Sequence, residues 1–297
     1  MRPAYAGTHR FAELVLTGLL GSRHQPVALI TNPDRPRGRH GKPQPPAIKE
    51  QAERAGLPVL QPDHPSQPQA VDALLATGAD VLVVCAYGQI LKQAVLDALP
   101  AIVVHPSLVP NWRGAAPVER ALMAGETTLG VAILKMTTGV DEGPVGASRH
   151  VNVPGDADAG RAYELLAAAA VEALLETLDG MEDGMLEWVP QAGDATYASK
   201  ITAADRQIDW RRPARAIADQ VRALSPHIGA VTELLGRRTL IWRAAPGEGL
   251  LPSAGGERLI MPAGRGWLEI LELQQEGRRR MSAQEFLRGA GRTLMQQ

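Results

Sequence analysis

The first two-thirds of the chain alternate short apolar runs with stretches of helical periodicity. The apolar runs lie at residues 27–31, 81–85, 101–105 and 130–136, and the helical patterns lie at residues 11–20, 46–55, 69–76 and 117–124. We expect a further strand at residues 1–6 with a ragged start, because Pro3 cannot donate to a ladder. Strands separated by crossover helices predict an α/β domain with a mostly parallel sheet that is covered on both faces.

The pattern changes after a long helical stretch at residues 159–179. Residues 190–199 have the composition of a linker, and a second unit begins near Lys200. One helix is predicted at residues 212–224. It should end there because Ser225 precedes Pro226, and a residue before proline disfavours helical backbone. Short strands follow at residues 230–235, 238–243, 257–261 and 267–273, separated by glycine-rich turns. This spacing predicts a small β-barrel, an architecture that often binds oligonucleotides.

Composition and charge narrow the class of protein. The 297 residues are 45% hydrophobic, which is enough for about two domains with a buried core. No apolar run approaches the ~18 residues that span a bilayer, so we expect a soluble, cytoplasmic protein with no membrane partner. Cys85 is the single cysteine, which excludes an internal disulfide framework and a multi-cysteine metal site. Residues 200–297 hold 16 basic and 10 acidic side chains, which fits either a weak nucleic-acid-binding module or a solvated arginine-rich surface.

Two polar side chains follow predicted strands and could carry chemistry. His105 ends the run at residues 101–105, and Asp141 lies in the loop T-G-V-D-E-G after residues 130–136. Strand ends are where ligands bind in such sheets. Taken singly, His105 could be a core histidine bonded to the backbone, and Asp141 could be a solvated turn residue. Together, a carboxylate that orients an imidazole gives acid–base chemistry or oxyanion stabilisation without a metal. Glycine-rich nucleotide-phosphate motifs are absent from the sequence.

Two loops complete the candidate site. Residues 107–110, S-L-V-P, follow Pro106 and form a stiff loop that can grip a flat heterocycle. Residues 32–44 carry four cationic side chains and no acid between positions 35 and 42, which suits phosphate contacts on a large polyanion or a solvated surface.

The combined motifs resemble those of methionyl-tRNA formyltransferases over nearly the whole chain. The resemblance rests on V-H-P-S-L-V-P-N-W-R-G-A-A-P, G-V-D-E-G, N-P-D-R-P-R-G-R, A-Y-G-Q-I-L, Y-A-S-K-I and M-S-A-Q. It implies a Rossmann-like formyltransferase domain at residues 1–189, a linker at 190–204 and an OB-like tRNA-binding domain at 205–297. The implied reaction moves a formyl group from 10-formyltetrahydrofolate to the amine of methionyl initiator tRNA. We expect a monomer without a metal, whose partners are this tRNA and tetrahydrofolate.

The resemblance also assigns roles to residues. His105 would stabilise the tetrahedral oxygen or handle protons, and Asp141 would orient His105 and help to remove a proton from the amine through water. Two further groups are assigned to the substrates. The folate contacts would be Ser107, Leu108, Val109, Pro110, Tyr87 and Gly88, and the tRNA contacts would be Arg35, Arg37, Arg39, Lys42 and Arg113.

Val103 departs from the family pattern, which carries an asparagine two residues before the histidine. Side chains at i and i+2 of a strand share a face, so Val103 replaces an amide donor where negative charge would develop. The loss of one such donor costs on the order of 10²–10³ in rate. We therefore expect a normal fold with impaired transfer. A non-catalytic tRNA- or folate-binding homologue and an amino-sugar formyltransferase are the alternatives.

Overall fold

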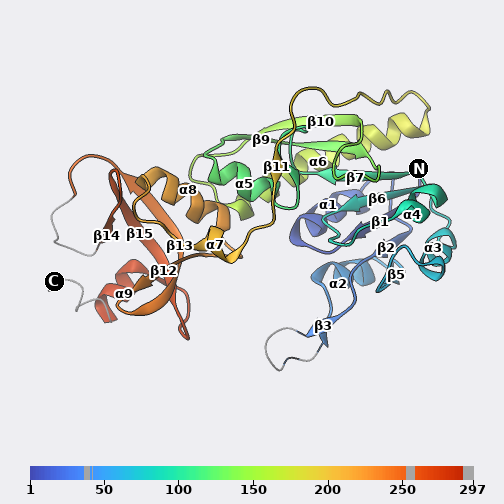
Figure 1. The fold of residues 1–297 in the computed structure, drawn as a ribbon. Coiled ribbons are helices and arrows are strands. Elements are labelled where there is room, and N and C mark those ends of the chain that lie inside the picture. The colour runs from blue at the N-terminus through green and yellow to red at the C-terminus, as the bar shows by residue number, and fades with distance from the viewer. Residues whose placement is uncertain (37–40, 42, 252–257, 290–297) are drawn as a thin grey trace. The chain divides into compact units, whose positions relative to one another are not determined.

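The computed structural model describes residues 1–36, 41, 43–251 and 258–289, and it divides into two compact units. Unit 1 comprises Met1–Gly114, Thr128–Val151 and Tyr163–Tyr197, and unit 2 comprises Ala115–Thr127, Asn152–Ala162 and Ala198–Gln297. Figure 1 labels most of their helices and strands.

Unit 1 is built on a seven-stranded sheet with the order β10-β9-β7-β6-β1-β2-β5. Its strands are β1 (Pro3–Gly7), β2 (Ala28–Ile30), β5 (Val59–Leu60), β6 (Val81–Cys85), β7 (Ala101–His105), β9 (Thr128–Lys135) and β10 (Val145–Asn152). The pairs β1–β2, β1–β6, β2–β5 and β6–β7 are parallel, and β7–β9 is antiparallel. The mostly parallel, Rossmann-like sheet predicted from the sequence is thereby confirmed.

Helices lie on both faces of this sheet. The helices of unit 1 are α1 (Arg10–Leu20), α2 (Ala47–Arg54), α3 (Pro68–Leu75) and α4 (Gln93–Ala98), and α6 (Ala159–Glu182) belongs mostly to it. Ala4 and Ala6 of β1 pack with Leu74 of α3 and Val95 of α4 on one face. Tyr5 points the other way and donates its hydroxyl to the Ala12 carbonyl of α1, at 2.9 Å. Successive side chains of this one strand therefore pack against helices on opposite faces of the sheet.

The expected ragged start of the first strand is wrong. β1 begins at Pro3 and is buried along its whole length. Pro3 is the first residue of the strand, where the missing N–H is tolerated. Its carbonyl accepts from the Val27 N–H at 2.8 Å, so the proline still takes part in ordering the sheet.

Unit 2 contains the predicted barrel-like sheet, in the order β12-β13-β15-β14 with β16 beside β15. Its elements are α5 (Pro117–Met123), α7 (Ala203–Arg206), α8 (Ala214–Leu224), β12 (Ala230–Leu234), β13 (Arg237–Gly247), β14 (Leu259–Pro262), β15 (Trp267–Gln275), β16 (Met281–Ser282) and α9 (Ala283–Gly289). The pairs are antiparallel, and register shifts around Arg243 mark an irregularity in the long strand β13. Such irregularities bend a strand and help a sheet to curl, as an OB-like half-barrel requires.

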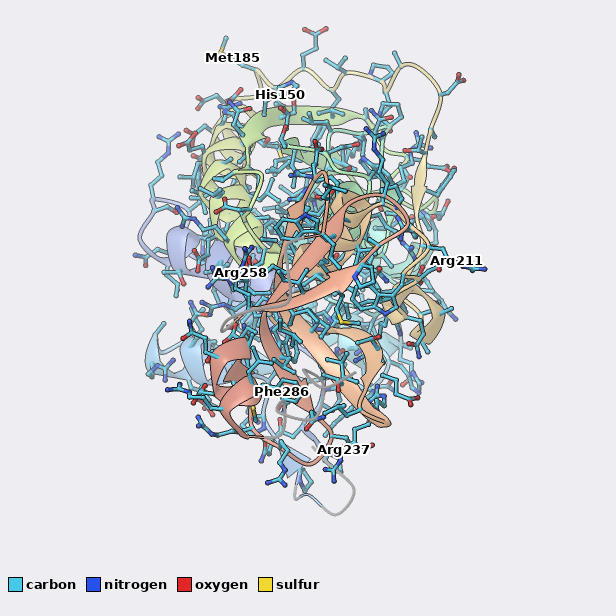
Figure 2. The ribbon with its side chains drawn as sticks, turned by 90° about the vertical axis from the view of Figure 1, so that its left-hand side faces the viewer. His150, Met185, Arg211, Arg237, Arg258 and Phe286 are labelled. Atoms are coloured by element: carbon cyan, nitrogen blue, oxygen red, sulfur yellow. The ribbon has the colours of Figure 1, made fainter. Side chains whose placement is uncertain are left out.

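The core of unit 2 joins this sheet to two helices. Ile217 and Val221 of α8 pack with Leu268 of β15 and with Phe286 of α9, which Figure 2 labels. Among the described residues, no helix combines the length and apolar character that crossing a membrane requires.

Candidate active site

His105 ends β7 and is buried, with 4% of its surface exposed. Its Nε2 lies 3.0 Å from the carbonyl oxygen of Trp112. Because a carbonyl oxygen can only accept, Nε2 carries the proton of this hydrogen bond. On the other side of the ring, Nδ1 lies 3.5 Å from Oδ2 of Asp141. The imidazole is thus held between a carbonyl and a carboxylate, which fixes the orientation of the ring.

Asp141 reaches His105 by a different route from the one that a parallel sheet would provide. β9 is antiparallel to β7, so its last residue, Lys135, lies beside Ile102 at the start of β7. Ala132, in the middle of β9, is the residue that lies beside His105. The loop after β9 therefore has to run back along the sheet to bring Asp141 to the imidazole.

The conformation of this loop is specific. Asp141 has φ +53°, in the left-handed region that aspartate tolerates better than most side chains. Its Oδ2 accepts the Gly114 N–H at 2.8 Å, so the same oxygen faces both this amide and His105. A Cβ atom at Gly143 would collide with the Lys135 carbonyl oxygen, which explains the second glycine of the motif. The loop therefore presents a fixed carboxylate to the histidine.

Residues 189–196, which we call the strap, bind the two segments that carry His105 and Asp141. Val189 exchanges two backbone hydrogen bonds with Val145, at 2.8 and 2.9 Å. The Gln191 side chain donates to the carbonyl oxygens of Asp141 and Gly143, both at 2.8 Å. Its Oε1 accepts from Nε and Nη2 of Arg113, at 3.1 and 2.7 Å.

Further along the strap, Thr196 binds the segment that follows His105. Its N–H donates to the Pro110 carbonyl at 3.1 Å, and its Oγ1 accepts the Trp112 N–H at 2.8 Å. Its carbonyl accepts the Arg113 N–H at 2.9 Å. Trp112 has φ +60°, so these bonds hold an unusual backbone conformation whose carbonyl in turn orients the imidazole.

The loop at residues 107–110 is ordered by its own hydrogen bonds. Ser107 is buried, and its hydroxyl donates to the Asn111 carbonyl at 2.6 Å. Leu108 fills the space beside Gly130, where a Cβ would collide with it. Val109 and Pro110 are half-buried. These contacts make the loop a stiff element next to His105.

Val103 lies on β7 between Val84 and Leu134 of the neighbouring strands. It is half-buried and packs against the apolar cluster that contains Leu82 and Ala101. Strand alternation places its side chain on the same face as His105. A branched apolar side chain therefore occupies the position two residues before the imidazole.

Tyr87 and Gly88 follow β6. Tyr87 is 2% exposed, and its hydroxyl has no hydrogen-bond partner among the described residues. Burial raises the pKa of this phenol to about 12. Tyr87 also lines a cavity of about 430 Å³ together with Leu74, Leu82, Leu91 and Val95. Of the six residues assigned to folate, Tyr87 is the one that lines this cavity.

The residues assigned to tRNA are only partly described. Arg35 is exposed in the short strand β3 (Arg35–Pro36), which pairs with β4 (Pro43–Gln44). The other three cations of this loop, Arg37, Arg39 and Lys42, lie outside the described residues. Arg113 belongs to β8 (Arg113–Gly114), beside β11 (Tyr197–Ala198), and its side chain is 13% exposed. Its guanidinium already binds Gln191, so it has a structural task within the site.

No cluster of three or more histidine, cysteine, aspartate or glutamate side chains in the described ranges is arranged to hold a metal ion. The strap is the part of the site that sequence reasoning missed, because residues 190–199 have a linker's composition. Gln191 and Thr196 lie in that segment and belong to no recognisable sequence motif, so no signal in the sequence indicated their role.

Known protein families and proteins match this chain over nearly its whole length. The formyl transferase family model matches residues 1–178, and the model of the formyl transferase C-terminal domain matches residues 200–291. A methionyl-tRNA formyltransferase of Symbiobacterium thermophilum is 41% identical, covering 97% of this chain and 92% of the relative. One from Brucella anthropi is 38% identical, covering 98% of each chain.

Solved structures share the fold. HypX from Aquifex aeolicus, in complex with tetrahydrofolic acid, has a TM-score of 0.70 at 21% identity over 97% of this chain. This chain spans 47% of the length of HypX. A methionyl-tRNA formyltransferase from Clostridium thermocellum has a TM-score of 0.58 at 14% identity, covering 82% of this chain and 93% of that one. The two family models and the near-full-length relatives show that the chain belongs to the methionyl-tRNA formyltransferase family of formyl transferases.

Proposed function

We propose that this chain transfers a formyl group from 10-formyltetrahydrofolate to the amino group of methionyl initiator tRNA. The observation that carries the proposal is the pair His105–Asp141, with Nδ1 and Oδ2 3.5 Å apart in a member of this family. The pair supplies an N–H donor and a carboxylate at one place, which acyl transfer to an amine requires.

The reaction would begin with attack of the methionyl nitrogen on the formyl carbon. The new C–N bond gives a tetrahedral intermediate. Because the Nε2 proton of His105 is bound to the Trp112 carbonyl, the donor to the tetrahedral oxygen would be a proton on Nδ1, the nitrogen that faces Asp141. Asp141 accepts the amine proton through a water molecule. The carbonyl then re-forms as the bond between the formyl carbon and N10 of the folate breaks, and the proton taken by Asp141 passes through water to N10 as tetrahydrofolate leaves. Asp141 also keeps the imidazole ring oriented throughout.

The folate would bind beside this pair, against Ser107, Leu108, Val109 and Pro110. The hydrogen bond from Ser107 to the Asn111 carbonyl keeps this loop stiff, which lowers the entropy cost of binding a flat ring. Tyr87 and Gly88 would complete the folate site. The unpartnered hydroxyl of Tyr87 supports this role, because a buried polar group without a partner is costly unless a ligand satisfies it.

The tRNA would be held by Arg35, Arg37, Arg39, Lys42 and Arg113, and by the basic module at residues 205–297. The folate module would be residues 1–189, with the connection at 190–204, and the protein would act as a cytoplasmic monomer. Val103 would leave the tetrahedral oxygen without the amide donor of the family pattern, so we propose that turnover is impaired.

A transfer assay with radiolabelled 10-formyltetrahydrofolate and methionyl initiator tRNA tests this function. We expect label on the tRNA, and we expect Asp141→Asn to reduce the rate by about 10²–10³-fold. Asp179→Asn is the matched control, because Asp179 Oδ1 lies 2.6 Å from Nε2 of the buried His24. This histidine–aspartate pair of unit 1 takes no part in the site. This control should keep the transfer rate.

The alternatives give different outcomes. Transfer to a nucleotide-linked amino sugar, without tRNA binding on filters, would contradict the proposal in favour of an amino-sugar enzyme. Tight tRNA binding without transfer, even after Val103→Asn, would identify a non-catalytic homologue. Binding through phosphate contacts should weaken at least tenfold between low and physiological salt.

A further inference from the structure

We propose that Gln191, in the segment with a linker's composition, is a positioning residue that holds the Asp141 carboxylate in its reactive place. This inference rests on the proposed function of the His105–Asp141 pair. It assigns to the strap a part in catalysis that its composition does not indicate.

The Gln191 amide uses its whole hydrogen-bonding capacity within the site. Its two N–H groups hold the carbonyl oxygens on either side of Glu142, at Asp141 and Gly143. Its oxygen accepts two hydrogen bonds from the guanidinium of Arg113. A planar amide that is bound on all sides has one orientation, so the loop carbonyls have fixed positions.

The loop needs such a clamp for two reasons. Asp141 has φ +53°, a left-handed backbone that a residue with a Cβ atom adopts less readily than glycine, even though aspartate tolerates it better than most side chains. In addition, β9 ends beside Ile102, so the strand itself does not place Asp141 near His105. The free energy of the Gln191 hydrogen bonds therefore has to stabilise a conformation that the chain does not otherwise prefer.

The clamp also fixes the partner of the carboxylate. Arg113, which Gln191 holds, is followed directly by Gly114, whose N–H donates to Asp141 Oδ2 at 2.8 Å. Gln191, Arg113, Gly114 and Asp141 thus form a closed ring of contacts. Loss of the amide opens this ring at the Asp141 carbonyl, and Oδ2 is then free to shift relative to the imidazole.

Gln191 itself is well anchored. Val189 pairs with Val145 just before it, and Thr196 binds the Pro110–Arg113 segment just after it. The strap is therefore tied to unit 1 on both sides of the glutamine. A catalytic group held through such an anchored neighbour is preorganised, and a shift of about 1 Å in such a group can cost about a hundredfold in rate.

Two variants test the proposal. Gln191→Met keeps the length of the side chain and removes every hydrogen bond, whereas Gln191→Glu keeps the acceptor for Arg113 and loses the two donors. Gln51→Met is the matched control: Gln51 is half-buried in unit 1, and its amide donates to the Glu13 carbonyl and to Thr17 Oγ1, at 3.2 and 2.8 Å. Each variant is made in the natural chain and with Val103→Asn, so that the rate stays measurable.

Three quantities are measured: kcat and KM for formyl transfer, the melting temperature, and hydrogen exchange of the Gly114 amide by NMR. We expect both Gln191 variants to lower kcat by roughly ten- to a hundredfold with KM for folate unchanged within about twofold. Exchange of Gly114 should rise about tenfold, because its acceptor moves. Gln51→Met should change the melting temperature by a similar amount but neither kcat nor the exchange of Gly114.

The exchange measurement separates this inference from the proposed function. If the natural chain and its Val103→Asn form transfer no formyl group to tRNA, the proposed function fails, and faster exchange of Gly114 still supports the clamp. Unchanged exchange in both Gln191 variants overturns the clamp whatever the activity. A fall in kcat no greater than that of Gln51→Met overturns it as well.

Discussion

Replacement of Val103 by asparagine is the most informative single change in this chain. Val103 lies on β7, half-buried, and shares the face of the strand on which His105 stands two residues later. Asparagine has nearly the same volume, so the ladder contacts with Val84 and Leu134 can persist. The change adds an N–H donor close to the imidazole, where the oxygen of the tetrahedral intermediate would develop charge.

Two opposing effects set the expected result. One preorganised donor at a developing oxyanion contributes a factor of about 10²–10³ in kcat, or about 3–4 kcal/mol. Against this, the half-buried amide replaces methyl groups that pack against Leu82 and Ala101, which costs about 1–2 kcal/mol of folding free energy in the absence of substrate. That cost lowers the melting temperature by about 2–8 °C. The two effects act on different quantities, because kcat belongs to the folded protein and a loss of about 1–2 kcal/mol leaves a typical domain folded, so the variant should be faster at 25 °C and less stable.

The assay is formyl transfer to methionyl-tRNA at saturating folate, together with thermal unfolding of the same preparations. Val103→Ala and Val103→Thr are the controls, since alanine removes packing without adding a donor and threonine adds a hydroxyl in place of a methyl. We expect a large gain in kcat for asparagine, a small one for threonine and none for alanine. An unchanged kcat in a folded Val103→Asn protein would refute the reasoning, and so would an equal gain in the alanine variant.

Three further changes have clear expected outcomes. Tyr87→Phe removes a buried hydroxyl that has no hydrogen-bond partner among the described residues, so the free energy of unfolding should stay the same or rise by about 1 kcal/mol. Calorimetry should show weaker tetrahydrofolate binding by this variant. A marked loss of stability would show that the hydroxyl does have a partner. Asp205 binds Arg120 and Thr202, which hold the pKa of its carboxyl well below the usual range. The stability that the ionised Asp205 contributes is complete above about pH 4 and is lost as the pH falls toward the lowered pKa. Urea unfolding should therefore show Asp205→Asn less stable than the unchanged protein by about 1 kcal/mol at pH 7, with a smaller difference in unfolding free energy at pH 3. An equal difference at both pH values would exclude the carboxylate as its source. Arg222 is 7% exposed and donates to Asp219 Oδ1 at 2.7 Å. Arg222→Met leaves a buried carboxylate without this partner, so it should destabilise unit 2 by about 3 kcal/mol. A melting temperature close to that of the unchanged protein would show that the buried pair contributes little to stability.

Sequence reasoning located the elements of the fold and the two catalytic candidates because both depend on local patterns. Apolar runs with flanking turns mark β6 and β7, and a histidine at the end of such a run lies where ligands bind. Helical periodicity likewise marked α8, and short spaced strands marked the curled sheet of unit 2. Each of these inferences needed only residues that are neighbours in the chain.

The orientation of β9 was beyond such reasoning. Hydrophobic periodicity is the same for a parallel and an antiparallel strand, so the run at residues 130–136 did not reveal that Lys135 lies beside Ile102. Only this orientation shows that Asp141 reaches His105 through a returning loop. The start of β1 at Pro3 is a similar case, because the position of a proline within a ladder depends on where its neighbours begin.

By itself, the sequence determined the two architectures, the placement of His105 at a strand end and the presence of valine at position 103. The tertiary structure alone decided that the imidazole rests on the Trp112 carbonyl and that Gln191 holds the loop of Asp141 from 50 residues away in the chain. The physical reason is that these contacts are made to backbone carbonyl groups, which every residue carries. A hydrogen bond to such a group leaves no pattern in the order of side chains, and it becomes visible only when the folded chain brings the two segments together.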